Sequence, residues 1–141
     1  MERREWLSIL ARAPHARLSA LATPFARQVR TLRAPETGSV MVRGRAGGTG
    51  AAFNLGEMTV TRASVALGDV VGHGHVQGRS KDAAMAAALV DALMQGPDAA
   101  KVRAEVLQPL KAMHTAANTT RAAKAAATKV DFFTLVRGED A

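Results

Sequence analysis

The sequence of 141 residues contains no cysteine, and this absence removes a whole class of chemistry. Without thiols the chain forms no disulfide and no thiolate metal site, and it suits a reducing compartment. Aromatic residues make up only 4% of the chain. Proteins that bind single-stranded nucleic acid usually stack the bases on aromatic rings, so this shortage makes nucleic-acid binding a weak option.

Long apolar runs are absent as well. No run reaches the roughly 18 residues that a membrane-spanning helix needs. The opening residues, Met-Glu-Arg-Arg-Glu-Trp, lack the apolar core of a signal peptide. We therefore expect a cytoplasmic protein that does not enter a membrane.

The residues that are present suit one folded domain, residues 1–141, with an anionic partner. Hydrophobic residues make up 48% of the chain, which is enough for a packed core. Lys and Arg number 19 against 12 Asp and Glu, so the net charge is +7. This charge favours a phosphorylated small molecule, an acidic protein surface or a nucleic acid as the partner.

Hydrophobic periodicity predicts an α+β fold built on an antiparallel sheet of about four strands, between residues 29 and 78. Two helices precede the sheet, over residues 2–13 and around residues 18–25, and a buried helix follows it over residues 80–95. Further helices begin at residue 99, and an apolar tail occupies residues 130–141. The four strands are expected over residues 29–33, 39–45, 58–67 and 70–78, with turns over residues 34–38, 43–50 and 54–57.

The dipeptide Gly68-Asp69 has the composition of a two-residue type II′ hairpin turn. That turn fixes the register, so that Val65 pairs with Gly72, Ala63 with Gly74, Ser64 with His73 and Arg62 with His75. One face of the hairpin is then small and apolar. The other face carries a row of polar side chains, namely Arg62, His73 and His75.

The segment after the hairpin predicts a capped and buried helix. Ser80 is a good N-cap, and Asp82 falls in the first turn, where a negative charge is favoured. Residues 83–94 are apolar almost all round, with Asp91 as the one interior charge. Such a helix is expected to lie buried across the sheet.

Two basic residues flank the start of this helix and make it a candidate anion site. Arg79 and Lys81 stand beside backbone amides that are free at a helix N-terminus. Arg62 and Arg45 extend the positive region if their strands are adjacent. The alternative is that these are ordinary solvated charges. The glycine-rich segment 43–50 lacks the Gly-Lys-Ser/Thr ending of a phosphate-binding loop and is better interpreted as a hairpin connection.

Metal and catalytic chemistry have less support. His73 and His75 share a face of a strand, but a metal site needs a third ligand, and His15 and His114 fall on separate helical segments. No metal site is therefore expected. No nucleophile triad or carboxylate pair stands out, so no catalytic residue is assigned, and a binding or scaffold domain is favoured.

The C-terminal region lacks a partner of its own. Residues 111–129 are rich in alanine, and their bare surface indicates a helix that lies on something outside the domain. The tail that follows is apolar, and it is expected to fold back as a strand or to dock on a partner. The candidate docking residues are Phe132, Phe133, Leu135 and Val136.

These segments, taken in order, resemble one family along nearly the whole chain: the G subunit of the carbon–phosphorus lyase core complex. The poorest match lies at residues 23–33 and 111–128, and Gly72-His73-Gly74-His75 is outside the pattern. The matching pieces are Arg4-Glu5-Trp6, Glu36-Thr37-Gly38, Gly47-Gly48-Thr49-Gly50, Leu55-Gly56-Glu57, Thr61-Arg62-Ala63, Gly78-Arg79, Leu89-Val90-Asp91-Ala92-Leu93-Met94, Pro109-Leu110 and Val130-Asp131-Phe132-Phe133-Thr134.

The resemblance implies a subunit rather than a self-sufficient enzyme. Such subunits are small α/β proteins at the centre of a two-fold assembly with the H, I and J subunits, and a homodimer within that assembly is expected. The complex transfers an alkylphosphonate to the ribose of ATP with loss of adenine, and that activity is attributed to the I subunit. ATP is then a substrate of the complex, and this chain binds no cofactor. The alternative is a stand-alone domain that binds a phosphate anion or a nucleotide.

Overall fold

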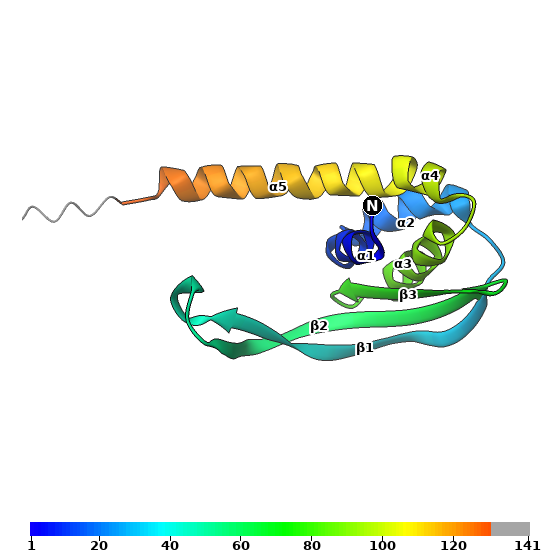
Figure 1. Ribbon diagram of the computed structural model, residues 1–141, viewed down its shortest axis with the longest axis horizontal. Coiled ribbons are helices and arrows are strands. Elements are labelled where there is room, and N and C mark those ends of the chain that lie inside the picture. The colour runs from blue at the N-terminus through cyan, green and yellow to red at the C-terminus, as the bar shows by residue number, and fades with distance from the viewer. Residues whose placement is uncertain (131–141) are drawn as a thin grey trace, which may run out of the picture.

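The computed structural model describes residues 1–130. Helices cover one face of a three-stranded antiparallel sheet with the order β1-β2-β3 (Figure 1). The expected docking residues Phe132, Phe133, Leu135 and Val136 lie outside the described residues. The elements in chain order are α1 (Arg3–Arg12), α2 (His15–Ala22), η1 (Thr23–Phe25), β1 (Arg30–Arg45), η2 (Ala46–Gly48), β2 (Ala52–Leu67), β3 (Val70–Gln77), α3 (Lys81–Met94), α4 (Ala99–Val102), η3 (Arg103–Leu107) and α5 (Gln108–Ala127).

The α+β fold is confirmed, but the prediction of about four strands is wrong, because the first two expected strands are one. Strand β1 runs straight through residues 34–38, where the sequence predicted a turn. Pro35 is tolerated there because β1 is an edge strand, where a missing N–H need not break the ladder. Register shifts on either side of Arg33 absorb the irregular segment.

The second expected turn, over residues 54–57, also lies inside a strand. Strand β2 contains these residues and pairs with β1 from Ala52 to Ala66. The register shifts between Val42 and Arg43, whose partners are Gly56 and Asn54. Leu55 is therefore the extra residue of a bulge, and the residues around this bulge resemble those of a turn.

The β2–β3 hairpin has the register that the sequence predicted. Gly68 has a φ of 59°, as the first position of a type II′ turn requires. Val65 pairs with Gly72 and Ser64 with His73, and the other expected pairs are present too. A two-residue turn leaves little freedom of register, which explains why this part of the sheet could be predicted.

Helix α3 lies directly on the small, apolar face of this hairpin. A Cβ atom added at Gly72 or Gly74 would collide with the backbone oxygen of Ala88 or Ala84 on the helix. The two glycines therefore let the helix backbone approach the strand backbone. As predicted, the helix is buried along its length, and Ser80 caps it by accepting a hydrogen bond from the Ala83 N–H at 3.1 Å.

The interior charge of α3, Asp91, is fully buried and fully hydrogen-bonded. Its Oδ1 accepts from the Trp6 indole N–H at 2.8 Å and from Arg3 Nε at 3.1 Å. Its Oδ2 accepts from Arg3 Nη2 at 2.7 Å and from the His73 backbone N–H at 2.8 Å. One carboxylate thus joins α1, α3 and β3. Its hydrogen bond and charge also raise the pKa of the Arg3 guanidinium.

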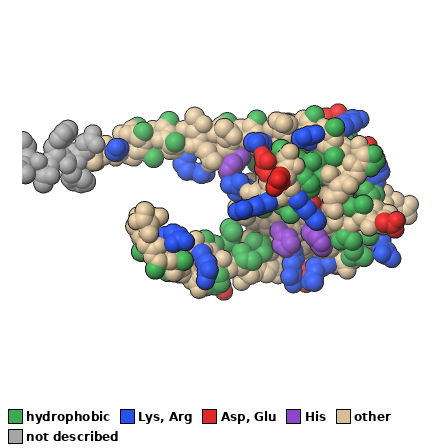
Figure 2. Space-filling model, viewed as in Figure 1, with side chains coloured by type: hydrophobic (Ala, Val, Ile, Leu, Met, Phe, Trp, Pro, Cys, Tyr) green, Lys and Arg blue, Asp and Glu red, His purple; other side chains and the backbone are tan. Residues whose placement is uncertain are grey.

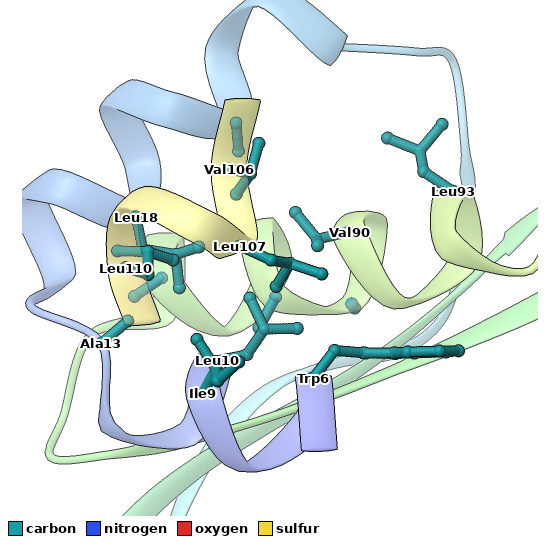
Figure 3. Close-up of a cluster of buried hydrophobic side chains, with 14 of the residues drawn as sticks. Trp6, Ile9, Leu10, Ala13, Leu18, Val90, Leu93, Val106, Leu107 and Leu110 are labelled. Atoms are coloured by element: carbon teal, nitrogen blue, oxygen red, sulfur yellow. The ribbon is translucent and has the colours of Figure 1, made fainter. Parts of the chain in front are cut away.

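The main core lies between the helices, mostly on the side of α3 that faces away from the sheet. Figure 3 shows side chains of α1, α2, α3 and the last helical segment pointing into one cluster, among them Leu10, Leu18, Val90 and Leu107. The last helical segment changes pitch at the π-turn Arg103–Leu107, just before Pro109. Pro109 stands in the first turn of α5, as expected for a proline that begins a new helix.

Two parts of the chain extend beyond this core. Strand β3 pairs only with residues 60–67 of β2, so residues 39–59 of the β1–β2 ribbon have no third strand. None of residues 111–130 is buried, although the helix continues to Ala127. Both segments point the same way in Figure 1. We call ribbon residues 39–59 and helix residues 112–127 the projecting arms.

Candidate functional site

The sheet face opposite α3 is open and carries a cluster of ionisable side chains. Arg62, His73 and His75 lie on it together, as the hairpin register predicted. Strand β1 adds Glu36, which is paired directly with Arg62 in the ladder, and nearby Arg33. We call Arg33, Glu36, Arg62, His73 and His75 the basic face.

Glu36 is the centre of the charge network on the basic face. Its Oε1 accepts from Arg33 Nη1 and from Arg62 Nε, each at 2.6 Å. The hydrogen bonds from Arg33 and Arg62 hold the pKa of the Glu36 carboxyl below its ordinary value. All three side chains are about half exposed, so water screens the pairs. The network therefore orients the arginines more than it stabilises the fold.

The two histidines differ in their surroundings. His73 Nδ1 is 2.8 Å from the Ser64 hydroxyl, whereas His75 forms no hydrogen bond with any described residue. Partial burial, and then the positive charges of Arg62, His73 and Arg33, lower the pKa of His75. His75 thus has ring nitrogens without a hydrogen-bond partner among the described residues, close to the guanidinium charges that lower its pKa.

A surface hollow of about 330 Å³ lies next to these groups. Gly38 and Val60, which are paired across β1 and β2, line the hollow. The hollow exists because Gly38 has no side chain, so the space above its backbone is empty. Glu36, Arg62 and His75 also line it. Sequence reasoning missed this hollow, since residues 34–38 were interpreted as a turn. The signal was Glu36 itself, a lone carboxylate in a segment that also contains several arginines.

The structure separates the four predicted anion-binding residues into three places. Arg62 belongs to the basic face. Arg79 and Lys81 are exposed at the start of α3, with no ion pair to another described residue. Arg45 lies at the tip of the ribbon and donates to the Gly50 carbonyl at 3.2 Å.

Arg45 is too far away to share a ligand with Arg62. Arg45 pairs with Ala52, and Arg62 is ten positions further along β2, roughly 33 Å at strand spacing. The expectation that Arg45 extends the same positive region is therefore wrong. The glycine-rich segment before Ala52 is the connection between β1 and β2, as the sequence favoured.

The histidines do not form a shared metal site within residues 1–130. His15 contacts the Gln77 carbonyl oxygen at 2.6 Å, and His114 lies on α5 near Asn118. Over the part of the chain that the structure describes, no three His, Asp or Glu side chains come close enough to hold a metal ion. Nor does any helix there have the length and apolar character that crossing a membrane demands.

The projecting arms form a second candidate site, which suits a macromolecule. Figure 2 shows a wide gap between the helical arm and the ribbon, with Lys, Arg and His side chains near its inner end. A hollow of about 460 Å³ between α1 and α5 is lined by Arg4, Arg12, Lys111 and His114, among others. Lys111 also donates to Glu5 at 2.7 Å and lowers the pKa of that carboxyl.

Large apolar side chains on the ribbon arm lie in the open. Phe53 is 45% exposed and Leu55 is 62% exposed, and Val40 and Met41 on β1, which pair with Met58 and Glu57, are similarly uncovered. Exposed apolar groups gathered on one thin arm are typical of a surface that meets another protein.

The fold and these surfaces define a small α+β protein that presents a basic sheet face and two arms to its surroundings. Its sequence matches the family model described as "Phosphonate metabolism protein PhnG" over residues 1–138, and the chain belongs to this family. A relative from Rhizobium meliloti (strain 1021) is 47% identical over 143 aligned positions, covering 99% of this chain and 91% of the relative. That relative is named alpha-D-ribose 1-methylphosphonate 5-triphosphate synthase subunit PhnG. The resemblance stated from the sequence is confirmed.

Proposed function

We propose that this chain is a non-catalytic or co-catalytic subunit of the synthase that transfers an alkylphosphonate to the ribose of ATP. The reaction releases adenine and gives ribose 1-alkylphosphonate 5-triphosphate. The observation that carries the proposal is the family match over residues 1–138, together with a relative whose name describes a subunit of such a synthase. ATP is a substrate of the complex in this account, and this chain binds no cofactor.

The projecting arms support the role of a subunit. Apolar side chains such as Phe53 and Leu55 are uncovered on a ribbon that has no third strand. Helix residues 112–127 likewise contribute no buried side chain to the core. In this proposal other subunits cover both arms.

The partners that we propose are the H, I and J subunits, with a second copy of this chain in the same cytoplasmic assembly. In this proposal the two arms contact these partners. On sequence grounds the apolar residues Phe132, Phe133, Leu135 and Val136 contribute to the same contact.

Co-expression with the other subunits of the synthase tests this role. The double variant Phe53→Ser and Leu55→Ser removes two of the exposed apolar side chains of the ribbon while leaving the core untouched. We expect at least a tenfold loss of the chain that co-purifies with a tagged partner subunit, because truncating an interface anchor typically costs about 2 kcal/mol or more.

The matched control is Leu32→Ser, which changes a side chain of similar exposure on β1 outside the arms. This control should co-purify like the parent chain. Full recovery of the double variant with its partners would contradict a docking role for the ribbon.

A further inference from the structure

The hollow on the basic face has the shape and the donors of a small ligand site. Gly38 forms its empty centre, because a Cβ atom added there would meet no atom within 4 Å. Val60 lies across the strand pair from Gly38, and Glu36, Arg62 and His75 also line the space. The hollow lies on the opposite face of the sheet from α3 and away from the tip of the ribbon.

The charges around the hollow favour an anion. Arg33 and Arg62 are permanently positive, and Glu36 cancels only one of them. Both arginines bond the same Glu36 oxygen, which holds Arg62 at the rim of the hollow instead of leaving it to move freely in solvent. His75 adds a side chain with no hydrogen-bond partner among the described residues.

We propose that this hollow binds a tetrahedral oxyanion, the phosphate or phosphonate group of a small molecule, with Arg62 and His75 as its donors. Guanidinium and imidazolium groups form short, charge-assisted hydrogen bonds to such oxygens. The hollow borders the base of the ribbon arm, where Ser39 and Val40 also line it, but its donors Arg62 and His75 lie on the basic face. The proposal therefore goes beyond the role as a subunit, and its test is separate.

Binding at this site takes up a proton on His75. In the free protein His75 faces Arg62 on β2, His73 on its own strand, and Arg33 and Glu36 on β1, and the positive groups outweigh the single carboxylate. A bound dianion reverses that balance and favours the imidazolium form. The ligand therefore raises the pKa of His75.

Nuclear magnetic resonance of the histidine ring protons in the full-length chain tests the proposal. The histidines are titrated in inorganic phosphate, in methylphosphonate, and in chloride at the same ionic strength, with the His75 signal assigned from His75→Gln. We expect phosphate and methylphosphonate to raise the pKa of His75 by about one unit, a tenfold change in proton affinity, and to leave His114 nearly unchanged. A further titration in acetate is the control for a planar anion. A His75 pKa that is the same in phosphate as in chloride, or that rises equally in acetate, would overturn the proposal.

Three variants separate a built site from general surface charge. Gly38→Val places a branched side chain in the hollow at a position where the added Cβ atom meets no atom within 4 Å, and Arg62→Gln removes a donor, so each should abolish the phosphate-induced shift. Arg43→Gln removes the same charge on the ribbon and should leave the shift intact. A shift that persists in both Gly38→Val and Arg62→Gln would overturn the proposal. These readouts need no partner subunit, so failure here leaves the co-purification result unaffected.

Discussion

Strand β2 contains two regions that differ sharply in burial although one continuous ladder with β1 joins them. Residues 60–67 are flanked by β3 and covered by α3, and most of their side chains are buried or half-buried. Residues 52–57 pair only with β1, and all of them are exposed. Both regions contain apolar residues, so the difference comes from what covers them. Hydrophobic pattern alone does not say whether the cover belongs to the same chain.

The largest predicted effect falls in the packed region, at Asp91. The variant Asp91→Ala leaves the buried Trp6 N–H and the His73 backbone N–H without partners, while half-exposed Arg3 regains water. Each unpaired buried donor costs about 1–3 kcal/mol, so we expect the free energy of unfolding to fall by about 3 kcal/mol in urea titrations. The control Asp69→Asn, at the exposed hairpin turn, should change it by less than about 0.5 kcal/mol. Equal effects would show that the packed region is not organised by this carboxylate.

A smaller loss is expected where α3 touches the sheet. In Gly74→Ala the new methyl group meets the backbone of Ala84, which cannot move as a flexible side chain can. Overpacking of this kind typically costs about 1–3 kcal/mol, measurable by chemical denaturation. Gly38→Ala makes the same chemical change in a strand where the methyl group meets nothing, so its stability should be unchanged or slightly higher. A neutral Gly74→Ala would mean that the helix does not need this close approach.

The projecting region should show almost no effect on stability. Phe53→Ser with Leu55→Ser should change the free energy of unfolding of the isolated chain, measured in urea titrations, by less than about 0.5 kcal/mol, because neither side chain packs in the core. A loss as large as that of Gly74→Ala would show that the ribbon belongs to the folded core after all.

The smallest effect concerns pH and the basic face. The folded-state pKa of Glu36 lies below its unfolded value, so its contribution to stability is present above the ordinary glutamate range and is lost as pH falls through the folded pKa. Glu36→Gln should therefore be slightly less stable than the parent chain at neutral pH, and the two should converge in acid. Urea titrations at several pH values measure the difference, and a gap that widens in acid would contradict the direction of the shift.

The sequence predicted the parts of the fold that depend on neighbouring residues. The turn at Gly68 set the hairpin register, and Ser80 marked the start of α3, because both signals act over a few positions. Asp91 was visible as an interior charge, but its partners Arg3 and Trp6 are 88 and 85 positions away. No local sequence signal predicts which residues pair with Asp91.

The candidate site was predicted only in part, for the same reason. The hairpin placed Arg62 beside His75, whereas the opposite side of the site comes from β1, whose Pro35 and Gly38 imitate a turn. Only the tertiary pairing of β1 with β2 shows that Glu36 faces Arg62 and that Gly38 leaves a hollow. Arg45 was grouped with Arg62 because the sequence did not predict how long the β1–β2 ribbon is.

Hydrogen–deuterium exchange of the chain alone and in complex with the other synthase subunits tests the contrast between the two regions most directly. The account predicts that amides of ribbon residues 39–59 and helix residues 112–127 become protected on assembly. Amides of α3 and β3, already protected in the free chain, should change little. Protection gained in α3 and β3 with both arms unchanged would contradict it.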